Sequence, residues 1–209
     1  MKVMMLFLMI SACSFAQIDI AEDTLRLNEV VVRKDDSRLN LKKVQLEGPC
    51  SYPENMQDVN EIITLVDKLP KGKLHSVTFY FNKIDAETYK KNASVFKEAE
   101  FEVVLYDAGT DGMPGIAAVV DRKSVAVSKA KRGRVTVDLS LYDIDTNKQM
   151  FIGLKRISGE AGGSNFFIDC LCSGQDKFFT YTRTTPAAAW ERRWSCAALK
   201  LDVRVIPNG

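Results

Sequence analysis

Histidine is almost absent from this chain of 209 residues, in which His75 is the only one. A Ser-His-Asp or Cys-His mechanism would therefore have to use His75 as its base. His75 begins the apolar segment 75–82, and no glycine-flanked serine of the nucleophile-elbow kind accompanies it. We expect a histidine of a strand edge or core, and we predict that the protein is not an enzyme.

An excess of basic charge is also lacking. The chain has 29 Lys and Arg against 27 Asp and Glu, a formal net charge of +2. A nucleic-acid-binding domain carries clustered basic residues, so we expect no nucleic-acid partner. The basic runs 129–134 and 191–193 are short, and the first is interpreted as a solvated hairpin tip. Internal repeats and low-complexity tracts are not evident, and the composition is that of an ordinary globular protein.

Apolar runs long enough to span a membrane are missing too. The segment 3–10 is apolar but short, it follows Lys2, and a small-residue site ends at Ala16. This pattern predicts a secretory signal peptide over residues 1–16. The segment 10–13 alternatively resembles the lipobox of bacterial lipoproteins, in which Cys13 would be lipidated and attach the protein to a membrane. Both alternatives predict an exported protein that is periplasmic, associated with the outer membrane or secreted.

Four cysteines follow the predicted signal peptide, namely Cys50, Cys170, Cys172 and Cys196. An even number in an oxidising compartment predicts two disulfides, with three possible connectivities. Cys170 and Cys172 are two residues apart on an expected strand, so they are poorly placed to pair with each other. We expect Cys50 and Cys196 to be their partners. Zinc is a weaker alternative, because the spacing is wrong and His75 is distant in sequence.

Residues 17–40 form a polar N-terminal arm with one hydrophobic island. The segment 27–32 resembles the TonB box of TonB-dependent outer-membrane receptors, and that resemblance implies a strand that pairs with the energising protein. The residues that would form the partner strand are Leu27, Glu29, Val30, Val31 and Val32. The chain is too short for the plug and barrel of such a receptor. A first β-strand, or a strand that pairs with another partner, is the favoured interpretation.

Residues 41–209 have the pattern of an antiparallel β-domain. The segment 101–115 begins as a strand, with Phe101, Val103 and Leu105 on one face, and then breaks into a loop of Asp, Gly and Pro. Further strands are expected at 41–46, 61–68, 75–82, 116–120, 124–129, 134–139, 150–157, 166–172, 178–184 and 198–206, with turns at 48–53 and at Arg132–Gly133. We predict an all-β, jelly-roll-like sandwich of about ten strands.

Three segments in order, 101–115, 135–139 and 150–154, resemble a broad group of secreted bacterial jelly-roll domains. The resemblance covers about residues 60–206. It implies an uncharacterised envelope or surface protein, with a fold that some carbohydrate-binding modules share. No catalytic motif of the group is found in this chain, and fold alone does not transfer a site.

The loop that follows residue 106 contains Asp107 and Asp111 among glycines. Carboxylates and carbonyls on a tight loop are ligands of the kind that calcium takes, although the pattern of an EF-hand is absent. Asp and Gly are also the residues that turns require. We favour the turn, expect no cofactor, and keep calcium as the alternative.

Trp190 and Trp194 lie four residues apart, with Arg192 between them. On a strand both indoles would share a face, where they could stack on sugar rings or anchor a protein interface. The favoured alternative is that one or both pack into the sandwich, as large aromatic residues do. The leading hypothesis is a non-catalytic exported binding or structural module that recognises a glycan or an envelope protein. An accessory protein of a TonB-dependent uptake system and a carboxylate-based hydrolase are the alternatives.

Overall fold

A computed structural model of the protein describes residues 40–56, 58–81, 99–118, 124–127, 133–157, 167–172 and 179–208. The chain divides into two compact units, Met1–Ser37 and Arg38–Gly209, and every described residue belongs to the second. The predicted signal peptide, Cys13 and the TonB-box-like segment 27–32 therefore lie outside the described residues. In the described part of the chain, no helix has the length and apolar character needed to cross a membrane.

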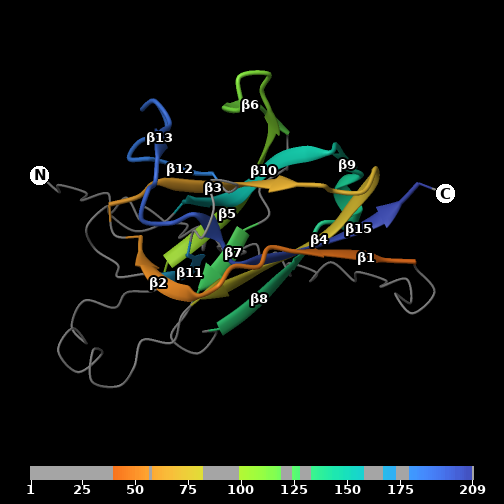
Figure 1. Ribbon diagram of the computed structural model, residues 1–209, viewed down its shortest axis with the longest axis horizontal. Helices are drawn as coiled ribbons and strands as arrows, with labels where there is room; N and C mark the ends of the chain where they lie inside the picture. Colours follow the sequence, from red (N-terminus) through yellow and green to blue (C-terminus); the bar gives the residue numbers. More distant parts are fainter. Residues whose placement is uncertain are drawn as a thin grey trace, which may run out of the picture. The chain divides into compact units, whose positions relative to one another are not determined.

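The described strands form two antiparallel sheets (Figure 1). The eight-stranded sheet contains β1 (Lys42–Gln45), β2 (Ser51–Asn55), β4 (Gly72–Phe81), β8 (Gly133–Asp138), β9 (Asp145–Thr146), β11 (Phe167–Leu171), β14 (Ala198–Leu199) and β15 (Leu201–Pro207). The seven-stranded sheet contains β3 (Glu61–Asp67), β5 (Ala99–Ala108), β6 (Pro114–Ala118), β7 (Ser124–Val127), β10 (Gln149–Arg156), β12 (Thr180–Arg183) and β13 (Glu191–Arg192). One short 3₁₀ helix, η3 (Ser140–Tyr142), joins β8 to β9.

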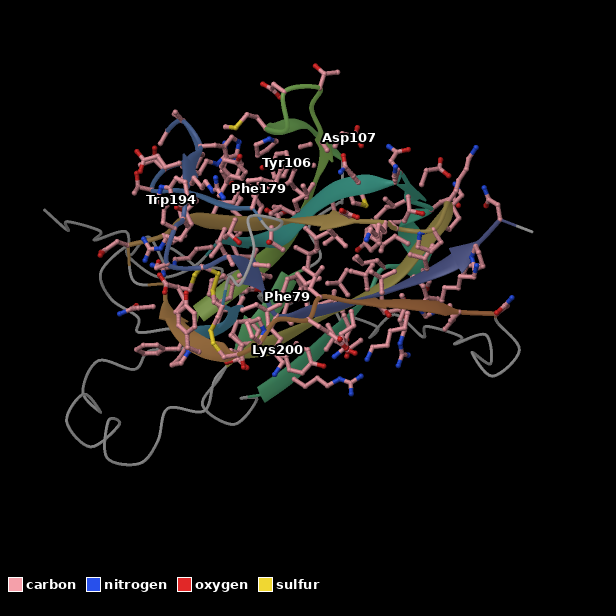
Figure 2. The ribbon with its side chains drawn as sticks, viewed as in Figure 1. Phe79, Tyr106, Asp107, Phe179, Trp194 and Lys200 are labelled. Atoms are coloured by element: carbon pink, nitrogen blue, oxygen red, sulfur yellow. A yellow bond between two sulfur atoms is a disulfide. The ribbon has the colours of Figure 1, made fainter. Side chains whose placement is uncertain are left out.

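The two sheets enclose one hydrophobic core. Alternate residues of a strand point to opposite faces, so each central strand contributes one apolar row. Val77, Phe79 and Phe81 of β4 are buried in this core, as are Phe101 and the two following alternate residues of β5. In Figure 1, β3, β10 and β12 form one layer and β1, β8 and β15 the other, with Phe79 between them in Figure 2. The predicted antiparallel β-sandwich is confirmed.

Two sequence-based expectations about the strands are wrong. The segment expected as a turn at 48–53 contains the start of β2, which pairs with β11. Pro53 of β2 lies opposite Asp169, and proline is tolerated there because β2 has no partner on its other edge among the described strands. The expected hairpin at Arg132–Gly133 does not form, because β7 pairs with β5 and β8 pairs with β4 of the other sheet. Arg132 itself lies outside the described residues.

Two disulfides meet at β11. Cys170 bonds to Cys196 and Cys172 bonds to Cys50, each with a Cα–Cα distance of 5.3 Å. This distance lies within the normal range for a disulfide. The pairing settles the connectivity that the sequence left open and confirms that Cys170 and Cys172 do not bond to each other. Two disulfides indicate a protein of an oxidising, exported compartment.

Candidate functional site

The outward face of the seven-stranded sheet carries a second apolar cluster, separate from the core. Its buried members are Ile63, Tyr106, Phe151 and Tyr181, and its partly buried members are Leu65, Val104, Ala108, Met113, Phe179 and Trp190. We call this set the outer cluster. The outward face of an antiparallel sheet is usually polar, so an aromatic cluster there needs covering or marks a contact surface. Part of the cover comes from Trp190, which meets Tyr106 edge to face at 5.5 Å between ring centroids.

A buried polar network fixes one end of the outer cluster. Glu61 lies opposite Arg183 in the pairing of β3 with β12, and its side chain is fully buried. Arg183 donates from Nε and Nη2 to Glu61 Oε2 at 2.7 and 2.5 Å, and the Tyr106 hydroxyl donates to Glu61 Oε1. Arg183 also donates to the Pro186 carbonyl oxygen at 2.9 Å. The network holds the segment after β12 against the sheet.

The surroundings of Tyr106 keep its hydroxyl protonated. Burial raises the pKa of Tyr106 above its usual value, and the hydrogen bond to Glu61 and the charge of Glu61 raise it further. The Arg183 charge acts in the opposite direction but is outweighed. Tyr106 is therefore a permanent hydrogen-bond donor in this network at neutral pH.

Trp190 covers the network. The Arg183 guanidinium carbon lies 4.4 Å from the centre of the Trp190 ring, which is the geometry of a cation–π contact. The Trp190 ring also contacts the Tyr106 ring, in the edge-to-face arrangement described above. Trp190 is therefore a packing residue of the outer cluster, half-buried, and it does not lie in the core between the sheets.

Trp194 lies in a different environment. Its side chain is 77% exposed, the largest exposed fraction of a bulky apolar residue among the described residues. The Arg192 guanidinium carbon lies 4.0 Å from the centre of the Trp194 ring and 4.4 Å from the centre of the Phe179 ring. We call these three residues the Phe179–Arg192–Trp194 stack. Figure 2 shows Phe179 and Trp194 on the side of the seven-stranded sheet that faces away from Phe79.

The turn that presents Trp194, residues 193–196, is anchored on both sides. Arg193 donates from Nε and Nη2 to Glu54 Oε1 at 2.8 and 2.5 Å, and the Ser195 hydroxyl donates to the same oxygen at 2.9 Å. Cys196 is joined covalently to Cys170 of β11. The Arg193 and Cys196 amides make further backbone hydrogen bonds, to Thr180 O at 2.8 Å and Arg193 O at 3.1 Å. The exposed indole is thus carried by a fixed backbone.

No family model, curated protein or solved structure matches this chain. The likeness to secreted jelly-roll domains therefore stays a prediction.

The predicted pair of indoles separates in the structure because strand β13 ends at Arg192. Strand alternation from Trp190 does not extend to Trp194, and the two rings have different neighbours. Phe179 was not among the predicted site residues. The sequence feature that could have identified Phe179 is its alternation with Tyr181 and Arg183 along the expected strand, which places all three side chains on one face. What the sequence did not show is that β13 would pair beside them.

The loop considered for calcium has the hydrogen bonds of a turn. The Met113 amide donates to Asp111 Oδ1 at 3.0 Å, and the Gly109 amide donates to the Met113 carbonyl oxygen at 2.8 Å. Gly112 has a φ of 75°, which favours glycine. Asp107 Oδ1 accepts a hydrogen bond from the Asn147 side chain at 3.2 Å. Among the described residues, no three His, Cys, Asp or Glu side chains come together as a metal site.

Tyr80 and Asp202 belong to neighbouring strands of the eight-stranded sheet, β4 and β15. The Tyr80 hydroxyl donates to Asp202 Oδ2 at 2.9 Å, and Lys43 pairs with the same oxygen at 3.0 Å. Burial, followed by this hydrogen bond, raises the pKa of Tyr80. His75 of β4 is buried. Among the described carboxylates, Glu54 and Glu61 each form an ion pair with an arginine.

Proposed function

We propose that this protein is a non-catalytic, exported binding module of the cell envelope or cell surface, which recognises a glycan through Trp194. The observation that carries the proposal is a 77% exposed indole on a turn held by a disulfide and an ion pair. Exposing a tryptophan has no benefit for folding, since burial of its ring would be favourable. A flat apolar ring with a polar edge suits the apolar face of a sugar ring.

The rigidity of the turn supports recognition by a preformed surface. A binding residue that is already ordered loses little conformational entropy when a ligand binds. Trp194 sits one residue from the Arg193–Glu54 ion pair and two residues from the Cys170–Cys196 disulfide. Arg192 also packs against one side of the indole. These contacts hold Trp194 in place without covering it.

A glycan array probed with the purified protein tests the proposal. We expect the wild type to bind a subset of glycans and Trp194→Ala to weaken that binding by at least about 2 kcal/mol, as for an interface hot spot. Leu141→Ala is the matched control, because Leu141 is a 66% exposed apolar residue of η3. Absence of glycan binding by the wild type, or equal loss in both variants, would refute the proposal.

A further inference from the structure

Three nearby arginines differ in what their N–H groups contact. Arg183 donates to Glu61 and Arg193 donates to Glu54. The side chain of Arg192 has no hydrogen bond or ion pair with any residue in the described part of the chain, and its guanidinium contacts two aromatic rings. An arginine carries five N–H donors and a permanent positive charge. An unused cationic donor edge therefore lies beside the exposed indole of Trp194.

The two ring contacts restrict how a ligand can reach Arg192. Cation–π contacts place the guanidinium against the ring faces of Trp194 and Phe179, at 4.0 and 4.4 Å. The N–H groups lie in the plane of the guanidinium, so they remain available along its edge. The edges of aromatic rings carry partial positive charge, so the rings of Trp194 and Phe179 also favour a negative group beside the N–H edge of Arg192. Held in this way, Arg192 is oriented for an anion before the ligand arrives.

A carboxylate matches this edge best. The planar guanidinium fork and a planar carboxylate form two parallel N–H···O bonds, which give both strength and direction. The preceding residue, Glu191, does not compete for the edge, because successive residues of β13 point to opposite sides. The adjoining Trp194 ring, with most of its surface exposed, offers an apolar platform next to the charge. A sugar ring that carries a carboxylate supplies both complementary parts.

We propose that the Phe179–Arg192–Trp194 stack binds a uronate residue of an acidic polysaccharide, with the sugar ring on Trp194 and its carboxylate on the N–H edge of Arg192. This inference rests on the proposed function and adds the charge and chemical class of the ligand. Trp194 supplies the contact with the sugar ring, and Arg192 selects the acid form over its neutral ester.

Matched acid and ester probes test the charge. Oligosaccharides of polygalacturonate, alginate and hyaluronate, each with and without methyl esterification of the carboxyl groups, are titrated into the protein by calorimetry. We expect at least one acid form to bind about tenfold or more tightly than its ester, the size of a charged hydrogen-bond contribution. Arg192→Gln should abolish this preference, and Arg192→Lys should keep part of it because the charge remains without the fork.

The control variant is Arg134→Gln, which removes the same charge from an exposed position of β8 in the other sheet. It should leave the acid preference unchanged. Equal binding of acid and ester, or equal losses in Arg134→Gln and Arg192→Gln, would overturn the inference and leave the proposed function standing. Poly-L-glutamate bound as tightly as the acid saccharides would overturn the assignment to a saccharide. Failure of the wild type to bind any of these probes, although it binds other glycans on the array, would likewise overturn the inference and leave the proposed function standing.

Discussion

Glu61 lies on the outward face of β3 and yet its side chain is fully buried. A buried carboxylate is tolerated only when it is paired and hydrogen-bonded, and here Arg183 and Tyr106 fill that role. Trp190 closes the network from outside. Removing one partner of a buried ion pair typically costs about 3–5 kcal/mol, so Arg183 is essential for stability rather than available for a ligand.

Tyr106 gives this network a signature at high pH. Its pKa is raised in the folded protein, whereas the unfolded chain has the ordinary tyrosine value of about 10. The stabilisation is therefore fully present below about pH 10 and is lost as pH rises toward the folded-state pKa. Tyr106→Phe should lower the free energy of unfolding by about 1.5–3 kcal/mol at pH 7, as expected for loss of a hydrogen bond to a charged group.

Urea unfolding of both proteins between pH 7 and 11 measures this effect. We expect the difference in unfolding free energy between wild type and Tyr106→Phe to shrink above pH 10. Tyr52 and Tyr80, whose pKa values are also raised, contribute equally in both proteins and cancel in the difference. A difference that stays constant over this pH range would contradict the assignment.

At the scale of the element, β10 and β3 approach each other closely at Gly153. Gly153 lies opposite Ile63 of β3 and Val104 of β5, in the middle of the outer cluster. A Cβ atom there would overlap the Ile62 carbonyl oxygen and lie 2.6 Å from the Ile63 Cα atom. Only glycine allows the strands this spacing.

Gly153→Ala should therefore destabilise the sandwich by about 1–3 kcal/mol or more, the cost of forcing extra atoms into a packed site. Thermal unfolding followed by circular dichroism measures the change in Tm. Gly115→Ala is the control, because its Cβ would lie 3.2 Å from the nearest atom, the Asp107 carbonyl oxygen, at an exposed position. Comparable losses in the two variants would show that the strand spacing is not responsible.

Strands with one buried face could be predicted from the sequence, because every second residue of such a strand is apolar. Val77, Phe79 and Phe81 are an example. The partner of a strand could not be predicted. β7 and β8 are close in sequence but pair in different sheets, and contacts distant along the chain decide that choice. For the same reason, the role of Phe179 could not be predicted from the sequence, since its position beside Arg192 depends on the pairing of β12 with β13. Trp194 could be identified because the two tryptophans on either side of Arg192 and Arg193 are visible in the local sequence.

At the scale of the whole molecule, two disulfides cross-link distant segments. Cys170–Cys196 spans 26 residues and Cys50–Cys172 spans 122. Chain-entropy estimates for such loops are about 3.5 and about 5 kcal/mol. The sum is comparable with the whole stability of an ordinary domain, about 5–15 kcal/mol.

We therefore expect reduction with dithiothreitol to lower the Tm strongly, and the pair variant C50S/C172S to lose more stability than C170S/C196S. Denaturant unfolding of the two pair variants measures the order. The opposite order would mean that native-state packing around Cys170, which is fully buried, outweighs loop length. The number and approximate pairing of the cysteines could be predicted from the sequence, whereas this energetic order depends on the connectivity.

The turn at residues 193–196 also connects the layers of the sandwich. Before it, β13 pairs with β12 of the seven-stranded sheet. After it, β14 pairs with β11 of the eight-stranded sheet, to which Cys196 is covalently bonded. A pull on Trp194 is therefore shared between both layers, and it meets a covalent bond within two residues. If the protein were attached to a surface through this indole, a shearing force would act on both sheets and on the disulfide together. Neither sheet would have to lose a strand before the disulfide carried the force.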